Sequence, residues 1–160
     1  MKRKKRKFKP KPGQVDYTYV RFAPVINCVL KHGGKILIVR RSRKMRLYPT
    51  YWNGIGGFLD DQKTLEGKVK EELREELGVK EKDILSIGRG DTFEVEEPKH
   101  KKVWIVHPVL ALVKNDRIKL NWEADEYRWV KLAQTKNFKL APSFKKVLEA
   151  LFNFDETMRL

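Results

Sequence analysis

Residues 56–79 read GGFLDDQKTLEGKVKEELREELGV, and the EELREE within them crowds four glutamates into six positions. On a helix, Glu72, Glu75 and Glu76 stand at i, i+3 and i+4, so all three share one face. Like charges at this spacing repel each other, each pair by roughly a few tenths of a kcal/mol. The stretch therefore indicates either a site that uses carboxylate oxygens or a solvated acidic face whose repulsion is tolerated.

The same stretch has the spacing of an amphipathic helix. Its apolar residues recur every four positions, at Leu65, Val69, Leu73 and Leu77. This spacing predicts one buried stripe. Gly78 follows the stripe directly, at a position where helices commonly end. Because the glutamates lie off the stripe, the predicted helix packs one face and presents acid on another.

Oxygen-rich side chains on a rigid helix suit a hard cation. Mg²⁺ takes a few carboxylates and fills its other positions with water and substrate phosphate. The glycine-rich segment WNGIGG (52–57) lies just upstream, where the backbone can approach an ion or a phosphate closely. The residues predict metal-dependent phosphate chemistry. A solvated glutamate face is the alternative, because Lys68, four residues before Glu72, offsets part of the repulsion.

The remaining pattern predicts a single α/β domain, which suits a length of 160 residues. Strand-like segments occur at 17–22, 24–30, 35–41, 83–97, 102–113 and 127–130, and a closing helix is predicted at 142–152. Strands and helices interleave without a regular βαβ rhythm, so we expect a mixed sheet flanked by helices. The expected organisation is a basic tail over residues 1–13 and one domain over residues 14–160.

The net charge is +15, and eight of the basic residues lie in the first eleven positions, MKRKKRKFKPK. A block of this kind either keeps the chain in solution or attracts RNA or another polyanion. Both interpretations stay open. The block is not followed by an apolar segment, and no apolar run approaches the roughly 18 residues of a membrane-spanning helix, so neither secretion nor a membrane partner is expected.

Cys28 is the single cysteine, which excludes an internal disulfide. A chain without disulfides is typical of a reducing compartment, so we expect a cytoplasmic protein. Cys28 itself stands between Asn27 and Val29 in an apolar segment and is expected to be a small buried hydrophobe.

Residues 57–79 resemble the Nudix box, G-x5-E-x7-R-E-U-x-E-E-x-G-U, in which U is a bulky aliphatic residue. Aligned from Gly57, the chain matches the box at Glu72, Leu73, Glu75, Glu76, Gly78 and Val79. The segment from Glu123 to Trp129 also looks Nudix-like, and the similarity extends over roughly residues 17–152. The resemblance implies a Nudix-type α/β/α sandwich, with a mixed β-sheet between helices.

Two positions depart from the box, and both departures reverse a charge. Lys63 stands where the family has Glu, and Glu71 stands where it has Arg. In the family these two residues support the loop and helix that orient the catalytic glutamate, and Gly57 and Gly78 share that structural role. We expect a swapped ion pair, held more loosely because Lys does not replace Arg in a bidentate contact.

The resemblance implies a pyrophosphohydrolase that uses Mg²⁺ or Mn²⁺ to cleave a diphosphate linkage by attack of water on phosphorus. Carried over by position, Glu72, Glu75 and Glu76 are metal ligands and catalytic residues. Glu72 is also the first candidate to position or deprotonate the water. The carbonyl of Gly56 is expected to add a metal ligand.

Other site residues are less closely tied to the box. Glu126 or Glu123 would serve as an additional base or ligand, unless the segment is a surface acidic loop. Arg40 and Arg41 would bind phosphate oxygens through charged hydrogen bonds, unless they are exposed cations at a strand end.

The implied substrate is a small molecule linked to a nucleoside diphosphate. Tyr48 and Trp52 offer stacking surfaces for a base, unless they pack in the core. Nucleotide sugars, ADP-ribose-like compounds, nucleoside triphosphates and dinucleoside polyphosphates all fit this class. The alternatives are a pyrophosphohydrolase of RNA 5′ ends, or a catalytically weak Nudix-fold protein that binds nucleic acid through the basic tail. The oligomeric state is left open.

Overall fold

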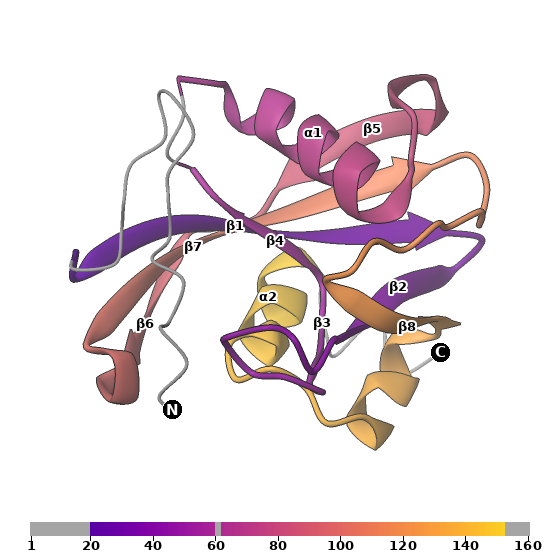
Figure 1. Cartoon of the computed structure of the whole chain (residues 1–160). Coiled ribbons are helices and arrows are strands. Elements are labelled where there is room, and N and C mark those ends of the chain that lie inside the picture. The colour runs from indigo at the N-terminus through magenta and orange to yellow at the C-terminus, as the bar shows by residue number, and fades with distance from the viewer. Residues whose placement is uncertain (1–19, 60–61, 153–160) are drawn as a thin grey trace, which may run out of the picture.

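The structure is a computed structural model that describes residues 20–59 and 62–152 (Figure 1). The predicted basic tail at residues 1–13 lies outside these ranges. The strands are β1 (Phe22–His32), β2 (Lys35–Arg41), β3 (Trp52–Asn53), β4 (Ile55–Phe58), β5 (Ile84–Arg89), β6 (Phe93–Glu97), β7 (Lys102–Val113) and β8 (Ala124–Val130). The helices are α1 (Leu65–Leu77) and α2 (Phe144–Leu151), with short 3₁₀ turns at Glu81–Asp83, Pro98–His100 and Leu132–Asn137.

The eight strands form one mixed sheet, as the sequence predicts. β1 pairs in parallel with β7 and antiparallel with β2 and β4, while β8 pairs with the outer side of β2. The predicted strand over residues 83–97 is two strands, because β5 and β6 pair with different halves of β7. The break faces Pro108, which has no N–H for the ladder, and Gly90 N donates to the Pro108 carbonyl instead, at 3.0 Å.

Helices cover both faces of the sheet, α1 on one side and α2 on the other (Figure 1). Alternate residues of the strands serve the two faces. Ile26, Cys28 and Leu30 of β1 belong to the core under α1, whereas Val29 belongs to the core under α2. The α/β/α sandwich is therefore confirmed, and Cys28 is buried as expected.

Local sequence determines where α1 begins and ends. The Thr64 hydroxyl accepts a 3.0 Å hydrogen bond from Gly67 N, which caps the first turn. Gly78 has a φ of 67° and its N–H returns to Arg74 O, so glycine suits this position for its positive φ. Val69, Leu73 and Leu77 are the buried stripe. Because the apolar and the acidic residues lie on different faces of α1, they determine which face of the helix packs against the sheet.

The predicted swapped pair is present at the start of α1. The Lys63 ammonium contacts the Glu71 carboxylate, and both groups remain partly exposed. The charge reversal therefore preserves the attraction between these two positions, while its effect on activity stays a prediction. None of the helices in the described ranges is long and apolar enough to cross a membrane.

Candidate active site

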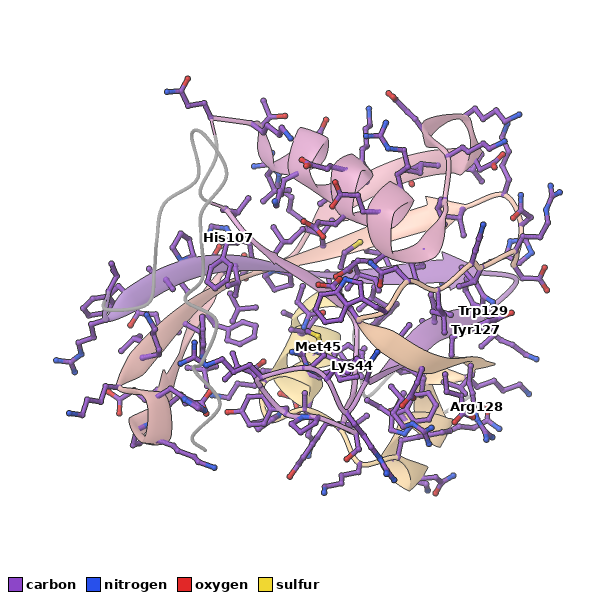
Figure 2. All side chains as sticks on the ribbon, in the orientation of Figure 1. Lys44, Met45, His107, Tyr127, Arg128 and Trp129 are labelled. Atoms are coloured by element: carbon purple, nitrogen blue, oxygen red, sulfur yellow. The ribbon has the colours of Figure 1, made fainter. Side chains whose placement is uncertain are left out.

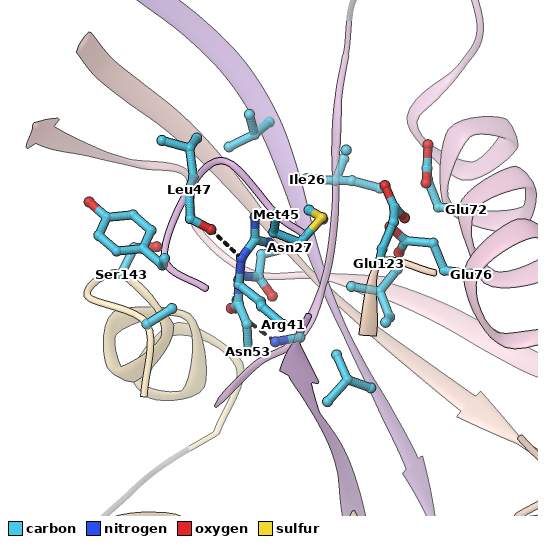
Figure 3. Close-up of a pocket in the computed structure, with 18 of the residues that line it drawn as sticks. Ile26, Asn27, Arg41, Met45, Leu47, Asn53, Glu72, Glu76, Glu123 and Ser143 are labelled. Atoms are coloured by element: carbon cyan, nitrogen blue, oxygen red, sulfur yellow. Dashed lines mark hydrogen bonds between the residues drawn. The ribbon is translucent and has the colours of Figure 1, made fainter. Parts of the chain in front are cut away.

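Two glutamates of α1 line a cavity of about 400 Å³. Glu72 and Glu76 lie one helical turn apart on α1, and Glu76 projects toward Glu123, which directly precedes β8 (Figure 3). The charged side chains around the cavity include Arg41, Lys68 and Glu97 as well. The helix α1 thus places its carboxyl groups at the same cavity as Glu123, which comes from a segment much later in the chain.

Within this cluster, the carboxyl groups of Glu76 and Glu123 lie next to each other (Figure 3). Burial raises the pKa of Glu76 well above its usual range, and the nearby Glu123 carboxylate raises it further by accepting a hydrogen bond and by its charge. Two carboxyl groups held this close in a buried place need a shared proton or a cation between them. Their hard oxygen atoms suit Mg²⁺ or Mn²⁺.

The fit of a cation rests on this pair. In the described part of the chain, no three His, Cys, Asp or Glu side chains already have the geometry of a metal site. Glu72 lines the same cavity, and its pKa is raised by burial and lowered in part by contact with Lys68. Glu75, by contrast, is exposed and does not line the cavity, although its charge raises the pKa of Glu72.

The two predicted arginines lie on opposite faces of β2, because neighbouring residues of a strand alternate. Arg41 lines the cavity, and its Nε donates a 2.7 Å hydrogen bond to Leu47 O. Burial lowers the pKa of Arg41, while the charges of Glu76 and Glu123 raise it. The guanidinium is thus held beside the carboxylate cluster.

Arg40 does not line the cavity, and Glu126 does not either. They are cross-strand partners of β2 and β8, and Arg40 pairs with Glu126 at 3.1 Å and with Asp125 at 2.7 Å. Glu126 also pairs with Arg128 at 2.9 Å. Figure 2 shows Arg128 on β8, away from Met45 of the loop that lines the cavity. Of the two glutamates predicted for an additional acidic role, the structure places Glu123 at the cavity and Glu126 outside it.

The two predicted stacking residues also differ. Trp52 is 8% exposed and packs edge to face on Phe138 in the core under α2, so it offers no stacking surface. Tyr48 lines the cavity, where burial and a hydrogen bond donated to Glu97 raise the pKa of its hydroxyl. Its φ of 47° and that of Thr50, 70°, are unusual for side chains of this kind. These two residues lie in the turn that connects the loop at residues 45–48, which lines the cavity, to β3.

An amide pair in the cavity wall was not predicted. Asn53 Oδ1 accepts hydrogen bonds from Gly54 N and from Asn27 Nδ2, both at 2.9 Å (Figure 3). Because Gly54 N–H can only donate, Asn53 Oδ1 is fixed as an acceptor and Asn27 Nδ2 as a donor. Asn27 is buried, and its Oδ1 accepts no hydrogen bond from the described residues. An asparagine inside the apolar segment PVINCVL was the available signal.

Gly57 controls the space available to Glu72. A Cβ added at Gly57 would lie 3.0 Å from both Cδ and Oε1 of Glu72. Gly57→Ala is expected to displace this carboxylate and to lower kcat/KM roughly 10- to 100-fold, with little loss of stability because the side chain can move. Turnover assays and urea unfolding of the same variant would check this. A drop in stability without a drop in kcat/KM would contradict it, and Gly88→Ala, whose methyl meets nothing within 4 Å, is the matched control.

A mixed sheet between two helices, with the acidic face of one helix turned onto a cavity, is the arrangement expected of a Nudix hydrolase. The NUDIX domain family model matches residues 21–151, so the chain belongs to this family. The predicted enzyme class is thereby confirmed at the level of the Nudix hydrolase family.

Individual relatives cover most of the chain. Nucleoside triphosphatase NudI of Klebsiella pneumoniae (strain 342) is 28% identical over 120 residues, which are 70% of this chain and 84% of that protein. The MutT protein from Methanosarcina mazei Go1 superposes with a TM-score of 0.65 at 24% identity, covering 88% of this chain and 97% of that one. The NUDIX domain of Shewanella oneidensis NrtR, solved with ADP ribose, gives 0.65 at 21% identity, covering 91% and 92%. Both structures share the fold.

Proposed function

We propose that the chain is a Mg²⁺-dependent hydrolase that cleaves a diphosphate linkage in a nucleoside diphosphate derivative. The observation that carries the proposal is the pair of carboxyl groups, Glu76 and Glu123, that face each other at a cavity of about 400 Å³. Cavities of this size accept small molecules. Nucleoside triphosphates are the first class to test, because the relative NudI carries that activity in its name.

Glu76 and Glu123 would hold the cation, with the Gly56 carbonyl as a further ligand, while Glu72 lines the same cavity beside them. A divalent cation bound there supplies charge that neutralises the diphosphate and lowers the pKa of a coordinated water. Glu72 would orient the attacking water and accept its proton as the water oxygen bonds to phosphorus and the P–O bond of the diphosphate linkage breaks. Arg41, fixed by its bond to Leu47 O, would bind phosphate oxygens on the other side of the cluster.

The rest of the cavity suits the nucleoside. Its wall is apolar and aromatic, with Val25, Tyr48, Val95, Trp104 and Val106 among the lining residues. Amides in such a wall give orientation and selectivity through a few fixed hydrogen bonds. We propose that Asn27 and Asn53, whose donors and acceptors are set by Gly54 N, orient the base.

Metal removal is the direct test of the proposal. The full chain would be incubated with nucleoside triphosphates, ADP-ribose, nucleotide sugars and dinucleoside polyphosphates, with Mg²⁺ or Mn²⁺, and the products separated by chromatography. Hydrolysis at the diphosphate linkage is expected, abolished by EDTA and restored by excess Mg²⁺. Hydrolysis that persists in EDTA would contradict the metal requirement. No product from any member, under conditions where Mn²⁺ binds, would contradict the hydrolase.

RNA ends belong in the same panel. The eight basic residues among the first eleven positions favour a polyanionic partner, although they lie outside the described residues. Release of pyrophosphate from 5′-triphosphorylated RNA would support the RNA alternative. RNA binding without hydrolysis of any substrate would support the weak, nucleic-acid-binding alternative.

A further inference from the structure

Lys68 is a lysine buried in the wall of the cavity. It is 6% exposed, and it lies on the same side of α1 as Glu72 and Glu76. The Nudix box leaves the residue type at this position open. A buried ammonium is unfavourable unless it is paired, so its presence at a carboxylate cluster requires a physical reason.

Its partner is Glu72, since Lys68 Nζ lies 3.1 Å from Glu72 Oε1, with both side chains largely shielded from solvent. Lys70, one half-turn further along α1, makes the opposite kind of pair. Its ammonium lies 2.9 Å from Glu81, and both side chains are open to solvent, outside the cavity. Charge on Lys68 therefore acts inside the site, whereas charge on Lys70 does not.

The cluster falls into two halves. Glu72 already has a cation at contact distance, whereas Glu76 faces Glu123, another carboxylate. The remaining cavity carboxylate, Glu97, accepts a 3.0 Å hydrogen bond from Trp104 and one from Tyr48, and is not part of either half. The cluster thus contains three carboxylates, those of Glu72, Glu76 and Glu123. Its two cationic groups are those of Lys68 and Arg41.

We propose that the Lys68 ammonium neutralises Glu72 in place of a metal ion. The site is thereby limited to one divalent cation, held by Glu76 and Glu123. The inference rests on the proposed function and deepens it. When all are ionised, the side chains of Glu72, Glu76, Glu123, Lys68 and Arg41 carry one net negative charge, which one divalent cation more than neutralises. A second divalent cation would meet repulsion from the first and from the ammonium in a medium of low dielectric constant.

Mn²⁺ binding to the full chain tests the inference without any turnover. Electron paramagnetic resonance counts free Mn²⁺ during a titration, and isothermal calorimetry gives the stoichiometry. The wild type is expected to bind one Mn²⁺ in the site. Lys68→Met should bind Mn²⁺ at least about tenfold more tightly or take up a second ion, because one neighbouring positive charge is gone.

Three further variants make the test more specific. Lys70→Met, which removes an equal charge from the solvent side of the same helix, should bind Mn²⁺ like the wild type. Lys68→Arg, which keeps the charge, should retain a stoichiometry of one. If Lys68→Met proves too unstable because Glu72 is left unpaired, Lys68→Met with Glu72→Gln should still hold one Mn²⁺ at Glu76 and Glu123.

Unchanged Mn²⁺ affinity and stoichiometry in Lys68→Met would overturn the inference, as would loss of Mn²⁺ binding from the double variant. Either result leaves the hydrolase proposal standing if substrate is still cleaved. Conversely, the expected change in Mn²⁺ affinity or stoichiometry, without hydrolysis of any substrate, would support the role of Lys68 and contradict the proposed function.

Discussion

Glu76→Gln is expected to lower kcat by about 10²–10³-fold, the loss seen when a group that stabilises transition-state charge is removed. The same change should make the metal-free protein more stable. In the metal-free protein Glu76 is buried against Glu123, so its ionised form is unfavourable and its pKa is raised. A neutral amide at this position removes that penalty, by about 1 kcal/mol or more at neutral pH. Turnover with Mg²⁺ and urea unfolding in EDTA would measure the two effects.

The pH dependence of stability in the metal-free protein tests the same effect of Glu76 independently. Because the folded state holds the Glu76 proton more tightly than the unfolded chain does, its contribution to stability is fully present below the unfolded pKa, near 4.3. It falls as the pH rises from there toward the raised folded pKa. Metal-free wild type should thus lose stability from pH 5 to pH 9, and Glu76→Gln should lose less. A steeper loss in the variant would show that Glu76 is not the group responsible.

Glu126→Gln is the matched control for turnover. It removes the same charge from a residue that pairs with Arg40 and Arg128 outside the cavity, so kcat should stay close to that of the wild type. Equal losses in Glu126→Gln and Glu76→Gln would contradict the assignment of the acidic role to Glu123 and the α1 glutamates.

Gly54→Ala is expected to destabilise the fold by about 3 kcal/mol, near the upper end for overpacking. The added Cβ would lie 2.3 Å from Asn27 Oδ1 and 2.8 Å from the Cys28 carbonyl oxygen, with Phe144 at 3.3 Å. The carbonyl belongs to β1, which is paired on both sides, so the backbone cannot withdraw. Urea unfolding followed by tryptophan fluorescence would measure the loss.

Gly88→Ala again provides the control, because its methyl meets nothing within 4 Å on β5. Its stability should stay within about 0.5 kcal/mol of the wild type or rise slightly, since alanine restricts the unfolded chain. Similar stabilities for Gly54→Ala and Gly88→Ala would show that β1 can move at Asn27, and would contradict the rigid placement of the amide pair.

Sequence reasoning reached the parts of the molecule that depend on local pattern. The stripe of α1, its end at Gly78, and the Lys63–Glu71 pair follow from spacing along one segment. The presence of Glu72 and Glu76 at the cavity follows from the same helical period. The mixed sheet and its two covering helices were also predictable, because apolar alternation identifies strands whatever their partners.

The parts that local pattern could not place depend on register and on burial by distant segments. Arg40 and Arg41 are equivalent in sequence, and only the pairing of β2 with β8 decides which one reaches the cavity. That pairing shifts by a bulge beside Arg41, so Glu126 falls opposite Arg40 and Glu123 is left at the cluster. From its sequence position Lys68 was expected only to offset repulsion between glutamates, yet it is 6% exposed in the wall of the cavity. No local pattern shows which neighbours will arrive from elsewhere in the chain.

The parallel pairing of β1 with β7 joins segments that lie roughly half the chain apart. Contacts of such long sequence separation form late and slowly, because a large loop must close first. Val25 of β1 and Val106 of β7 are cross-strand partners and both line the cavity, so this wall of the cavity depends on that closure. A chain that ends before β7 would therefore lack this wall of the cavity, even with every residue of α1 present. Activity at the proposed site would therefore require β7 to have joined the sheet.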